Sequence, residues 1–367
     1  MKITFPNLGN TIFAAKAVFD GLDIDYVLPP KSNKTILENG CLYSPEEICL
    51  PFKIMIGSYI ESIKKGADTI LLVGSCGPCR FGEYCELQMN VLKNLGYNLN
   101  FIVIDSPGDI GTKEFMRRLS EINNESSKST HEKLKVLFSA LKIINLIDSI
   151  EKKAKYMSGY EINTGECKSI LRQCKEDAIK CNSPYKMLST LKYYKNKLDG
   201  ILVDKNKNPL RIAVIGEIYT IIEPFSNLFI EDKLLNYGTS VTRYLTPSWW
   251  IKNTLLSVLK LNSPRIRSYS KKYLPFYIGG HARECIGEAM IAKKDGLDGA
   301  IQIFPMGCMP EIVSKSILPT ISRNEDLPIL TLVVDELTGE DGYITRIEAF
   351  LDLLERRKSK CIIEELT

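Results

Sequence analysis

Short apolar runs alternate with amphipathic stretches over the first 125 residues. The runs with strand character are Ile3 to Leu8, Asp25 to Leu28, Thr69 to Val73 and Phe101 to Asp105. Helical periodicity covers Glu46 to Lys65, Phe81 to Leu95 and Lys113 to Ile122. Strands that alternate with amphipathic helices are typical of a parallel sheet in an α/β fold. We therefore expect an N-terminal α/β domain over residues 1–125.

The middle of the chain has a different pattern. Between Ser126 and Leu198, glycine is rare, lysine is abundant and apolar residues recur at helical spacing without any strand-like run. This pattern predicts a helical insert or linker over residues 126–205.

A second alternation of strands and helices predicts a C-terminal α/β domain over residues 206–367. Its expected strands are Arg211 to Tyr219, Thr239 to Leu245, Gly299 to Phe304 and Pro328 to Asp335. The fold class is then α/β, with two Rossmann-like parallel-sheet domains and a helical insert between them, and we expect the two halves to be distant structural copies. Ligands of open parallel sheets gather at the carboxyl ends of the strands, so the residues that follow these strands are the first candidates for a site.

Length and charge narrow the class of protein. A chain of 367 residues suggests two or three domains, because single cores seldom grow past about 250 to 300 residues. Its 48 basic and 44 acidic side chains give a net charge of only +4, so neither nucleic acid nor an anionic membrane is expected as a partner. No segment approaches the roughly 18 uninterrupted apolar residues of a membrane span, and we expect a cytoplasmic protein.

The eleven cysteines carry the strongest chemical signal. In a reducing cytosol, cysteines are more often metal ligands or redox thiols than structural disulfides. Only two histidines are present, which favours sulfur-only ligation over mixed zinc sites. Most of the cysteines lie where predicted strands give way to loops, often beside Gly or Pro, namely Cys41, Cys49, Cys76, Cys79, Cys85, Cys285 and Cys308. This distribution indicates an iron–sulfur cluster site built between the two domains.

The segment Cys76-Gly77-Pro78-Cys79 supports two interpretations. It is the dithiol sequence of thioredoxins, in which a helix N-terminus lowers the pKa of the first thiol and makes it nucleophilic. A two-thiol exchange gives no role to the other loop cysteines, whereas a cubane needs about four thiolates. The cluster is therefore favoured, with dithiol exchange, structural zinc and plain packing as the alternatives.

Cys49 and Cys308 are the remaining primary ligand candidates. Cys49 falls within a helix that is expected to begin near Ser44-Pro45, and Pro51 interrupts the hydrogen bonds around Cys49 and aims it outward. Cys308 sits between a strand end and a helix that begins with Pro310. Cys41, expected in a loop, is held in reserve with Cys85 and Cys285.

His281 is the candidate catalytic residue, as a proton donor near the substrate. It follows two glycines and an expected short strand from Pro275 to Ile278. The alternative is that His281 caps the next helix while Cys285 packs beneath it. Three further cysteines recur every seven residues on one predicted helix face and are expected to pack, namely Cys167, Cys174 and Cys181.

Charged residues supply weaker candidates for cofactor binding. Arg80 and Arg283 lie beside candidate ligands, where they would offset the negative charge of a thiolate-bound cluster; surface or inter-helix salt bridges are the alternative. Glu223 opens an expected helix whose amides would hold an anionic group, or it caps that helix. Neither a P-loop nor a Gly-x-Gly-x-x-Gly motif after a strand is present, so intrinsic ATP or dinucleotide binding is not expected.

Several ordered motifs resemble one known family. They are Cys49-Leu50-Pro51-Phe52-Lys53, Cys76-Gly77-Pro78-Cys79-Arg80-Phe81-Gly82, Gly216-Glu217-Ile218-Tyr219 with Glu223-Pro224-Phe225, Gly279-Gly280-His281-Ala282-Arg283-Glu284, Cys308-Met309-Pro310-Glu311 and Asp335-Glu336-Leu337-Thr338-Gly339. Together they resemble the acyl-CoA dehydratase activase-related proteins, also called CoA protein activases, nearly end to end.

The resemblance implies membership of the broad superfamily of 2-hydroxyacyl-CoA dehydratases and double-cubane cluster proteins. Its members have two α/β domains with an iron–sulfur cluster between them, of 4Fe-4S or double-cubane type. A separate ATP-hydrolysing iron–sulfur activator supplies low-potential electrons, which pass to an acyl-CoA thioester or another small molecule. Cys49, Cys76, Cys79 and Cys308 match the family cysteines. Cys41, Cys85 and Cys285 do not, which leaves one cubane and a double cluster both open.

We therefore expect an iron–sulfur protein that accepts electrons for reductive or dehydratase-type chemistry. Two other classes of function stay open from the sequence. One is a thiol–disulfide oxidoreductase that uses Cys76 and Cys79, and the other is a non-catalytic iron–sulfur scaffold or regulatory partner.

Overall fold

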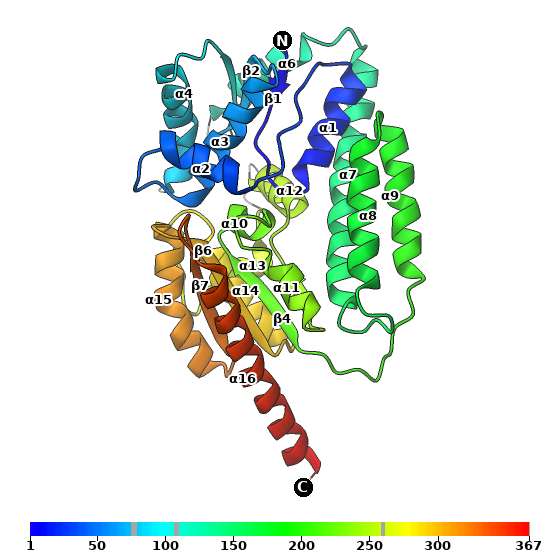
Figure 1. Cartoon of the computed structure of the whole chain (residues 1–367), viewed down its shortest axis with the longest axis vertical. Helices are drawn as coiled ribbons and strands as arrows, with labels where there is room; N and C mark the ends of the chain where they lie inside the picture. The colour runs from blue at the N-terminus through cyan, green and yellow to red at the C-terminus, as the bar shows by residue number, and fades with distance from the viewer. Residues whose placement is uncertain (75–78, 106–109, 258–260, 367) are drawn as a thin grey trace. The chain divides into compact units, whose positions relative to one another are not determined.

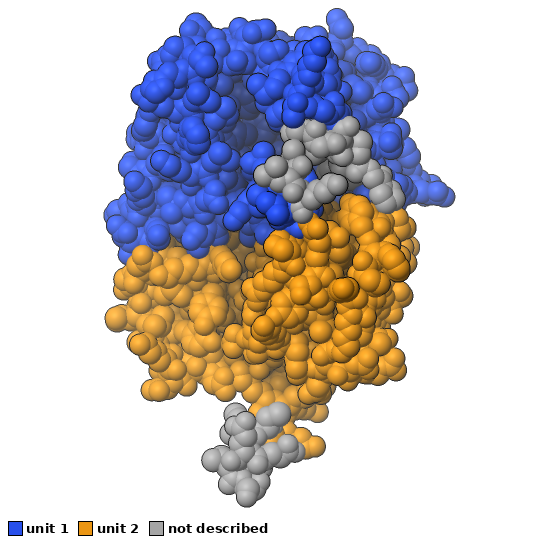
Figure 2. All heavy atoms as spheres, turned by 180° about the vertical axis from the view of Figure 1, so that it is seen from behind, with its two compact units in different colours: residues 1–150, 172–196, 246–262 blue, residues 151–171, 197–245, 263–367 orange. Residues whose placement is uncertain are grey.

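The computed structural model describes residues 1–74, 79–105, 110–257 and 261–366. The chain divides into two compact units, coloured separately in Figure 2. Unit 1 comprises residues 1–150, 172–196 and 246–262, and unit 2 comprises residues 151–171, 197–245 and 263–367. The domain boundaries expected after residues 125 and 205 stay predictions, since compactness alone does not show which part folds independently.

Unit 1 is built on a parallel sheet whose described strands run in the order β1-β2-β3. Figure 1 labels β1 and β2 of this sheet. The strands are β1 (Ile3–Thr4), β2 (Thr69–Val73) and β3 (Asn100–Ile104). Its helices include α1 (Thr11–Leu22), α2 (Lys34–Tyr43), α3 (Leu50–Lys64), the 3₁₀ turn η1 (Arg80–Glu83), α4 (Tyr84–Asn94), α6 (Thr112–Asn123) and α12 (Pro247–Ser257). Apolar side chains of β1, β3 and α1 share one core cluster, as the alternating pattern predicts.

Unit 2 holds a second parallel sheet, with strand order β5-β4-β6-β7. Its strands are β4 (Arg211–Gly216), β5 (Ser240–Arg243), β6 (Gly299–Pro305) and β7 (Ile329–Val334). Its helices are α10 (Ile218–Ile222), α11 (Ile230–Asn236), α13 (Pro264–Ser270), α14 (Ala282–Lys294), α15 (Met309–Asn324) and α16 (Glu340–Leu366). Every residue of β6 is buried, as expected for a central parallel strand covered on both faces. The predicted α/β fold class is confirmed.

The two sheets repeat the same strand order. In unit 1, Ile3 of β1 bridges Tyr26 in parallel on one side and pairs with Thr69 of β2 on the other. In unit 2, β4 lies between β5 and β6 in the same way. The chain therefore crosses from one side of the first strand to the other in both units, which creates a switch point at the carboxyl ends of the central strands.

Equivalent aspartates fix the start of the first strand in both units. The backbone N–H of Lys2 donates to Asp68 Oδ1 at 2.7 Å, and the N–H of Arg211 donates to Asp298 Oδ2 at 2.7 Å. Asp68 immediately precedes β2, and Asp298 immediately precedes β6. A matching hydrogen bond in addition to a matching strand order supports two structurally related halves.

Three long helices lie between the two sheets in sequence, as predicted: α7 (Thr130–Met157), α8 (Glu166–Lys180) and α9 (Pro184–Asp199). Val136 of α7 packs into the core cluster of unit 1, and Asn10 at the start of α1 donates to Asp148 Oδ1 at 2.8 Å. Cys167, Cys174 and Cys181 are buried along α8 and just after it, so the packing interpretation holds for them. No helix among the described residues is both long and apolar enough to cross a membrane.

Several predicted element boundaries are wrong. Asp25 to Leu28 forms only a bridge at Tyr26, the strand beginning at Ile3 ends at Thr4, and Pro275 to Ile278 forms no strand. Cys41 lies in the last turn of α2 rather than in a loop. The strand from Arg211 ends at Gly216, because the Glu217 side chain accepts from the N–H groups of Tyr219 and Thr220 and begins a helix there.

The start of α3 is the correction that matters most for the site. Ser44 ends α2, and α3 begins at Leu50 with Cys49 as its N-cap. Pro51 therefore lies in the first turn, where its missing N–H leaves no hydrogen bond unmade, and it does not interrupt the helix.

Helices α2 and α3 cross at two glycines. A Cβ atom added to Gly40 would lie 1.8 Å from the carbonyl oxygen of Lys53, and one added to Gly57 would lie 1.9 Å from that of Ile36. Backbone atoms cannot give way as flexible side chains do, so this crossing requires glycine on both helices.

We expect Gly57→Ala to lower the free energy of unfolding by about 2–3 kcal/mol, because the methyl group forces the two helices apart. Gly342→Ala is the control, since nothing lies within 4 Å of its added Cβ and it is in a helix; it should leave stability within about 1 kcal/mol or raise it. Urea denaturation of both variants measures the difference. Equal effects of the two substitutions would contradict the close crossing.

Candidate functional site

Two thiols and one phenol meet at the carboxyl edge of the unit 1 sheet. Cys49 caps the start of α3, Cys79 precedes η1, and Tyr84 begins α4. The Cys49 thiol and the Tyr84 hydroxyl form a short hydrogen bond. Burial raises the pKa of Tyr84, and the nearby Cys49 and Cys79 raise it further. Arg80 has the opposite effect on this pKa. The electrostatic influence of both thiols on one hydroxyl indicates that Cys49 and Cys79 face the same small region.

The segment that carries Cys49 is held by two cations. Arg80 donates from Nη1 to the carbonyl oxygen of Glu47 at 3.3 Å. Lys53, which is buried on α3, donates from Nζ to the carbonyl oxygen of Glu46 at 3.0 Å. Both cations thus position the turn before α3, which presents Cys49 at a helix N-terminus, where the helix dipole favours a thiolate. Tyr84 is fixed in turn by Phe52, whose ring centroid lies 5.0 Å away in an edge-to-face arrangement.

The other unit 1 candidates differ in exposure. Cys85 is buried, its Sγ donates to the carbonyl oxygen of Gly82 at 3.7 Å, and burial raises the pKa of its thiol. Cys41 is partly buried at the end of α2. Cys76 lies outside the described residues, so its predicted role as a ligand stays a prediction.

The described residues do not complete a cluster site. Among them, no three or more Cys, His, Asp or Glu side chains are grouped to hold a metal ion. Cys49 and Cys79 together would supply half of the roughly four thiolates that a cubane needs. The arrangement in unit 1 fits a partial ligand set, and a cubane bound there would need further thiolates.

The switch point of unit 2 lies between the carboxyl ends of β4 and β6. Gly216 ends β4 with φ of 132°, and a Cβ there would lie 2.0 Å from the carbonyl oxygen of Ile303 in β6, so the two strand ends approach too closely for any side chain. Cys308 follows β6 directly and is the N-cap of α15, as predicted. Cys308 and Cys49 are thus each the N-cap of a helix that has Pro in its first turn.

Buried carboxyl groups gather behind this edge. Glu284 and Glu288 lie on α14, and Glu311 lies on the first turns of α15; all three are at most 4% exposed. Glu311 Oε2 accepts from Gln302 Nε2 at 2.9 Å, and Gln302 Oε1 accepts from Thr331 at 3.0 Å. Both oxygens of Glu288, Oε2 of Glu284 and Oε1 of Glu311 have no hydrogen-bond partner among the described residues.

Proximity and burial make these carboxyls poor acids. Burial raises the pKa of Glu311 to about 7, and Glu217 and Glu284 add to the rise while Gln302 opposes it. Burial, followed by Glu284 and Glu311, raises the pKa of Glu288 well above its usual range. Burial therefore favours the protonated form of these carboxyl groups, because desolvation disfavours several charges in one dry region.

His281 is the N-cap of α14 but makes no capping hydrogen bond through its side chain. Burial lowers its pKa to about 4. The imidazole is therefore neutral at neutral pH, and it can accept a proton or donate a hydrogen bond, whereas the predicted proton donor in its charged form requires acid conditions.

The other unit 2 candidates have clear positions. Cys285 is fully buried in the core cluster with Ile286 and Ala289, and burial raises its pKa. The Arg283 guanidinium lies over the Tyr277 ring at 5.2 Å and 3.8 Å from Glu284 Oε1. Glu223 ends α10, and its carboxylate accepts from the N–H of Ser226 at 2.8 Å. Glu223 therefore stabilises the turn after α10 and does not open a helix as predicted.

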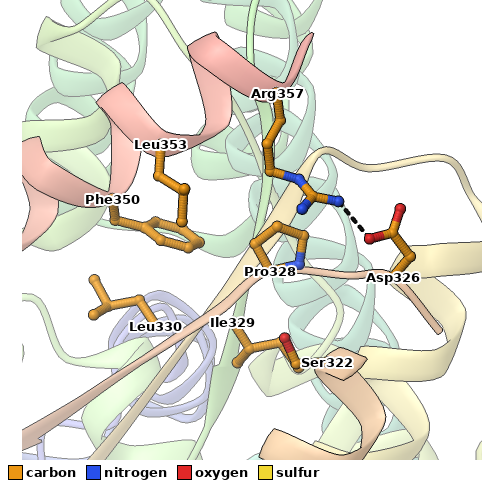
Figure 3. A pocket seen from close by; sticks show the side chains of 8 residues that line it. All are labelled: Ser322, Asp326, Pro328, Ile329, Leu330, Phe350, Leu353 and Arg357. Carbon is orange, nitrogen blue, oxygen red and sulfur yellow. Dashed lines mark hydrogen bonds and ion pairs between the residues drawn. The ribbon is translucent and has the colours of Figure 1, made fainter. Parts of the chain in front are cut away.

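A pocket of about 280 Å³ lies elsewhere, at the N-terminal end of β7. In Figure 3, Phe350 and Leu353 of α16 line it together with Leu330, and Arg357 pairs with Asp326 at its rim. Its lining contains no cysteine or histidine. We therefore place the candidate chemistry at the carboxyl edges of the sheets.

Residues 7–79 match the family model described as CoA enzyme activase uncharacterised domain (DUF2229). This segment is therefore similar to a CoA enzyme activase domain. The match confirms the resemblance to CoA protein activase-related proteins, and it runs from α1 through β2 to Cys79, so it includes Cys49 and excludes Cys308 and His281. No curated protein matches the chain.

Tyr84 and Glu288 are among the site residues that were not predicted from the sequence. Tyr84 follows the dithiol segment, where an aromatic residue is an ordinary helix core position, and only its contact with Cys49 distinguishes it. Glu288 lies four residues after Glu284, a spacing that on most helices marks a solvated face. Glu288 is nevertheless fully buried, because α13, α15 and the sheet enclose α14.

We expect Glu288→Gln to be stabilising relative to the wild type at about pH 8 and much less so at about pH 5. The raised pKa means that the folded chain keeps a proton that the unfolded chain has lost. The free energy of unfolding of the wild type therefore falls as the pH rises above the usual pKa of a glutamate, by up to about 1.4 kcal/mol per pH unit. The variant does not show this fall at position 288, because a glutamine does not titrate.

Urea denaturation at both pH values measures the gap between variant and wild type. Glu355→Gln, at an exposed position on α16, should show no such widening. A gap for Glu288→Gln that is the same at both pH values would show that this carboxyl is ionised in the folded chain.

Proposed function

We propose that the chain is an iron–sulfur protein related to the acyl-CoA dehydratase activases, which accepts low-potential electrons from a separate ATP-hydrolysing activator for reductive or dehydratase-type chemistry. The observation that carries the proposal is the approach of Cys49 and Cys79 to one tyrosine hydroxyl at the carboxyl edge of a parallel sheet. The activase domain match over the same segment adds to it.

The proposed primary ligands are Cys49, Cys79, Cys76 and Cys308. The first two are supported by their position beside Tyr84, and the last two rest on the sequence motifs and on the place of Cys308 after β6. A 4Fe-4S or double-cubane cluster, when bound, would supply one-electron transfer at low potential.

The residues around these thiols have roles that can be stated from their own contacts. Tyr84 shares a hydrogen bond with the Cys49 sulfur, which stabilises negative charge on that atom when the hydroxyl donates. Lys53 and Arg80 hold the turn that presents Cys49. In unit 2, Glu311 has a pKa of about 7, which suits it to proton transfer, whereas the neutral His281 would act by donating a hydrogen bond.

We also propose a reducing, cytoplasmic setting and an acyl-CoA or other small-molecule substrate. Cys85, Cys167, Cys174, Cys181 and Cys285 are free thiols in the structure, as a reducing compartment would keep them. The substrate class rests on the activase family alone.

Iron and acid-labile sulfide per chain after anaerobic purification and reconstitution test the proposal. We expect about four of each for one cubane, or about eight for a double cluster. Cys49→Ser, Cys79→Ser and Cys308→Ser should each lose most of the iron. Cys181→Ser is the matched control and should retain it, because a serine hydroxyl can keep the bonds of the Cys181 thiol to Asp177 and Thr190.

The outcomes separate the alternatives. Wild-type protein without iron would refute the cluster. Dithiol exchange would then be supported by a thiol–disulfide exchange activity that survives Cys49→Ser and Cys308→Ser but is lost in Cys79→Ser. Full iron retention in Cys308→Ser would remove Cys308 from the ligand set. Iron content as proposed, without electron uptake from any reductant, would favour a structural scaffold.

A further inference from the structure

Helix α7 presents a row of large apolar side chains to solvent. Leu134, Leu137, Phe138 and Leu141 are 49%, 48%, 62% and 38% exposed. Their spacing of three, four and seven residues places them on one helix face over about 10 Å of its axis. We call these four residues the α7 stripe. Exposed apolar groups that are contiguous in this way usually mark an interaction surface.

The α7 stripe is not needed to hold α7 in place. The opposite face is buried through Val136, Ala140, Ile143, Ile144 and Ile147. Val136 packs into the unit 1 core, and near the end of the stripe Asp148 accepts hydrogen bonds from Asn10 and from the N–H of Ser248 at 2.8 and 2.7 Å. The stripe is therefore displayed on a helix that is already fixed on its other side.

The charged side chains that α7 itself places beside the stripe are positive. Lys135 and Lys142 each directly follow a stripe leucine, both are exposed, and neither forms an ion pair with a described residue. No Asp or Glu occurs between Glu132 and Asp148. Glu132 is already engaged, because its Oε2 accepts from both the N–H and the hydroxyl of Ser129 at the start of the helix.

We propose that the α7 stripe docks an amphipathic helix of a partner protein whose apolar face is bordered by Asp or Glu. Leucine-like side chains at helical spacing would pack between Leu134, Phe138 and Leu141, as in other helix-on-helix recognition. Acidic side chains at the border would pair with Lys135 and Lys142, which sets the choice of partner. The proposal does not depend on the iron–sulfur role.

A second copy of this chain is a poorer occupant. Two copies that paired through the α7 stripe would bring four lysines together, and the stripe offers no carboxylate to neutralise them. Repulsion of like charges disfavours that pairing, whereas an acidic partner satisfies both the apolar and the charged parts of the surface.

Binding of two synthetic helical peptides to the full-length chain tests the proposal by fluorescence anisotropy. Both carry leucines at helical spacing; one has Glu and the other Lys at the bordering positions. We expect the Glu peptide to bind at least about tenfold more tightly at low salt, with a smaller advantage at about 0.5 M salt because screening weakens the ion pairs. Phe138→Ser should weaken its binding at least about tenfold.

Two further variants distinguish a specific surface from general stickiness. The double substitution Lys135→Glu with Lys142→Glu should reverse the preference in favour of the Lys peptide. Leu202→Ser removes an apolar side chain that lies outside the stripe and is 67% exposed. This substitution should leave the affinity for both peptides unchanged. Circular dichroism melts should be the same for all variants, since the substituted side chains are exposed.

Equal binding of the two peptides, or binding that ignores Phe138→Ser, would overturn the proposal. Failure of both peptides to bind would also overturn it. Sedimentation that finds a dimer dissociated by Phe138→Ser would assign the surface to a second copy instead.

Discussion

The reversal of strand order at the first strand of each sheet is the constraint on which the candidate chemistry depends. When successive connections leave one strand in opposite directions, the loops at its carboxyl end separate, and side chains from the neighbouring strands can reach the opening. In unit 1 this opening lies between β1 and β2, and in unit 2 it lies between β4 and β6. Asp68 and Asp298 hold the opposite ends of these strand pairs together.

The two openings differ in the chemistry that they collect. Unit 1 brings the Cys49 sulfur next to a phenol that can stabilise negative charge on a thiolate, and two cations hold the turn before it. Unit 2 places carboxyl groups with raised pKa values on α14 and α15, the helices whose N-caps are His281 and Cys308. Unpartnered carboxyl oxygens in a dry interior reduce stability, and such features are retained most often where function requires them. Thiols at one edge and carboxyl groups with raised pKa values at the other agree with the proposed reductive chemistry.

Periodicity alone predicted the fold well where a strand or helix is long and its pattern is regular. Thr69 to Val73 is a strand with the predicted ends, and the helix expected over Lys113 to Ile122 is α6. The errors arose where two local signals conflict. Ser44-Pro45 has the composition of a helix start, but Gly40 and Gly57 let α2 continue to Tyr43 against α3. Within the strand predicted for Asp25 to Leu28, only Tyr26 pairs with the sheet, through a single bridge to Ile3.

The site was predictable in its residue types and less so in its geometry. Chain direction in a parallel sheet fixes where the loops after strands lie, so the place of Cys308 after β6 could be predicted, while its role as a ligand stays a prediction. The partner of Cys49 was not predictable, since Tyr84 is close to it only through the packing of α4 against α3. Nor could the burial of Glu288 be predicted, because a polar residue on a helix normally faces solvent and the enclosure of α14 is a tertiary effect.

The electron paramagnetic resonance spectrum of the anaerobically prepared chain, recorded before and after chemical reduction, tests the central claim most directly. The account predicts a signal that appears on reduction, matches the iron content and is altered by Tyr84→Phe, because that substitution removes the hydrogen bond to the Cys49 sulfur. A chain that stays silent and iron-free under both conditions, while its melting curve is that of a folded protein, would contradict it.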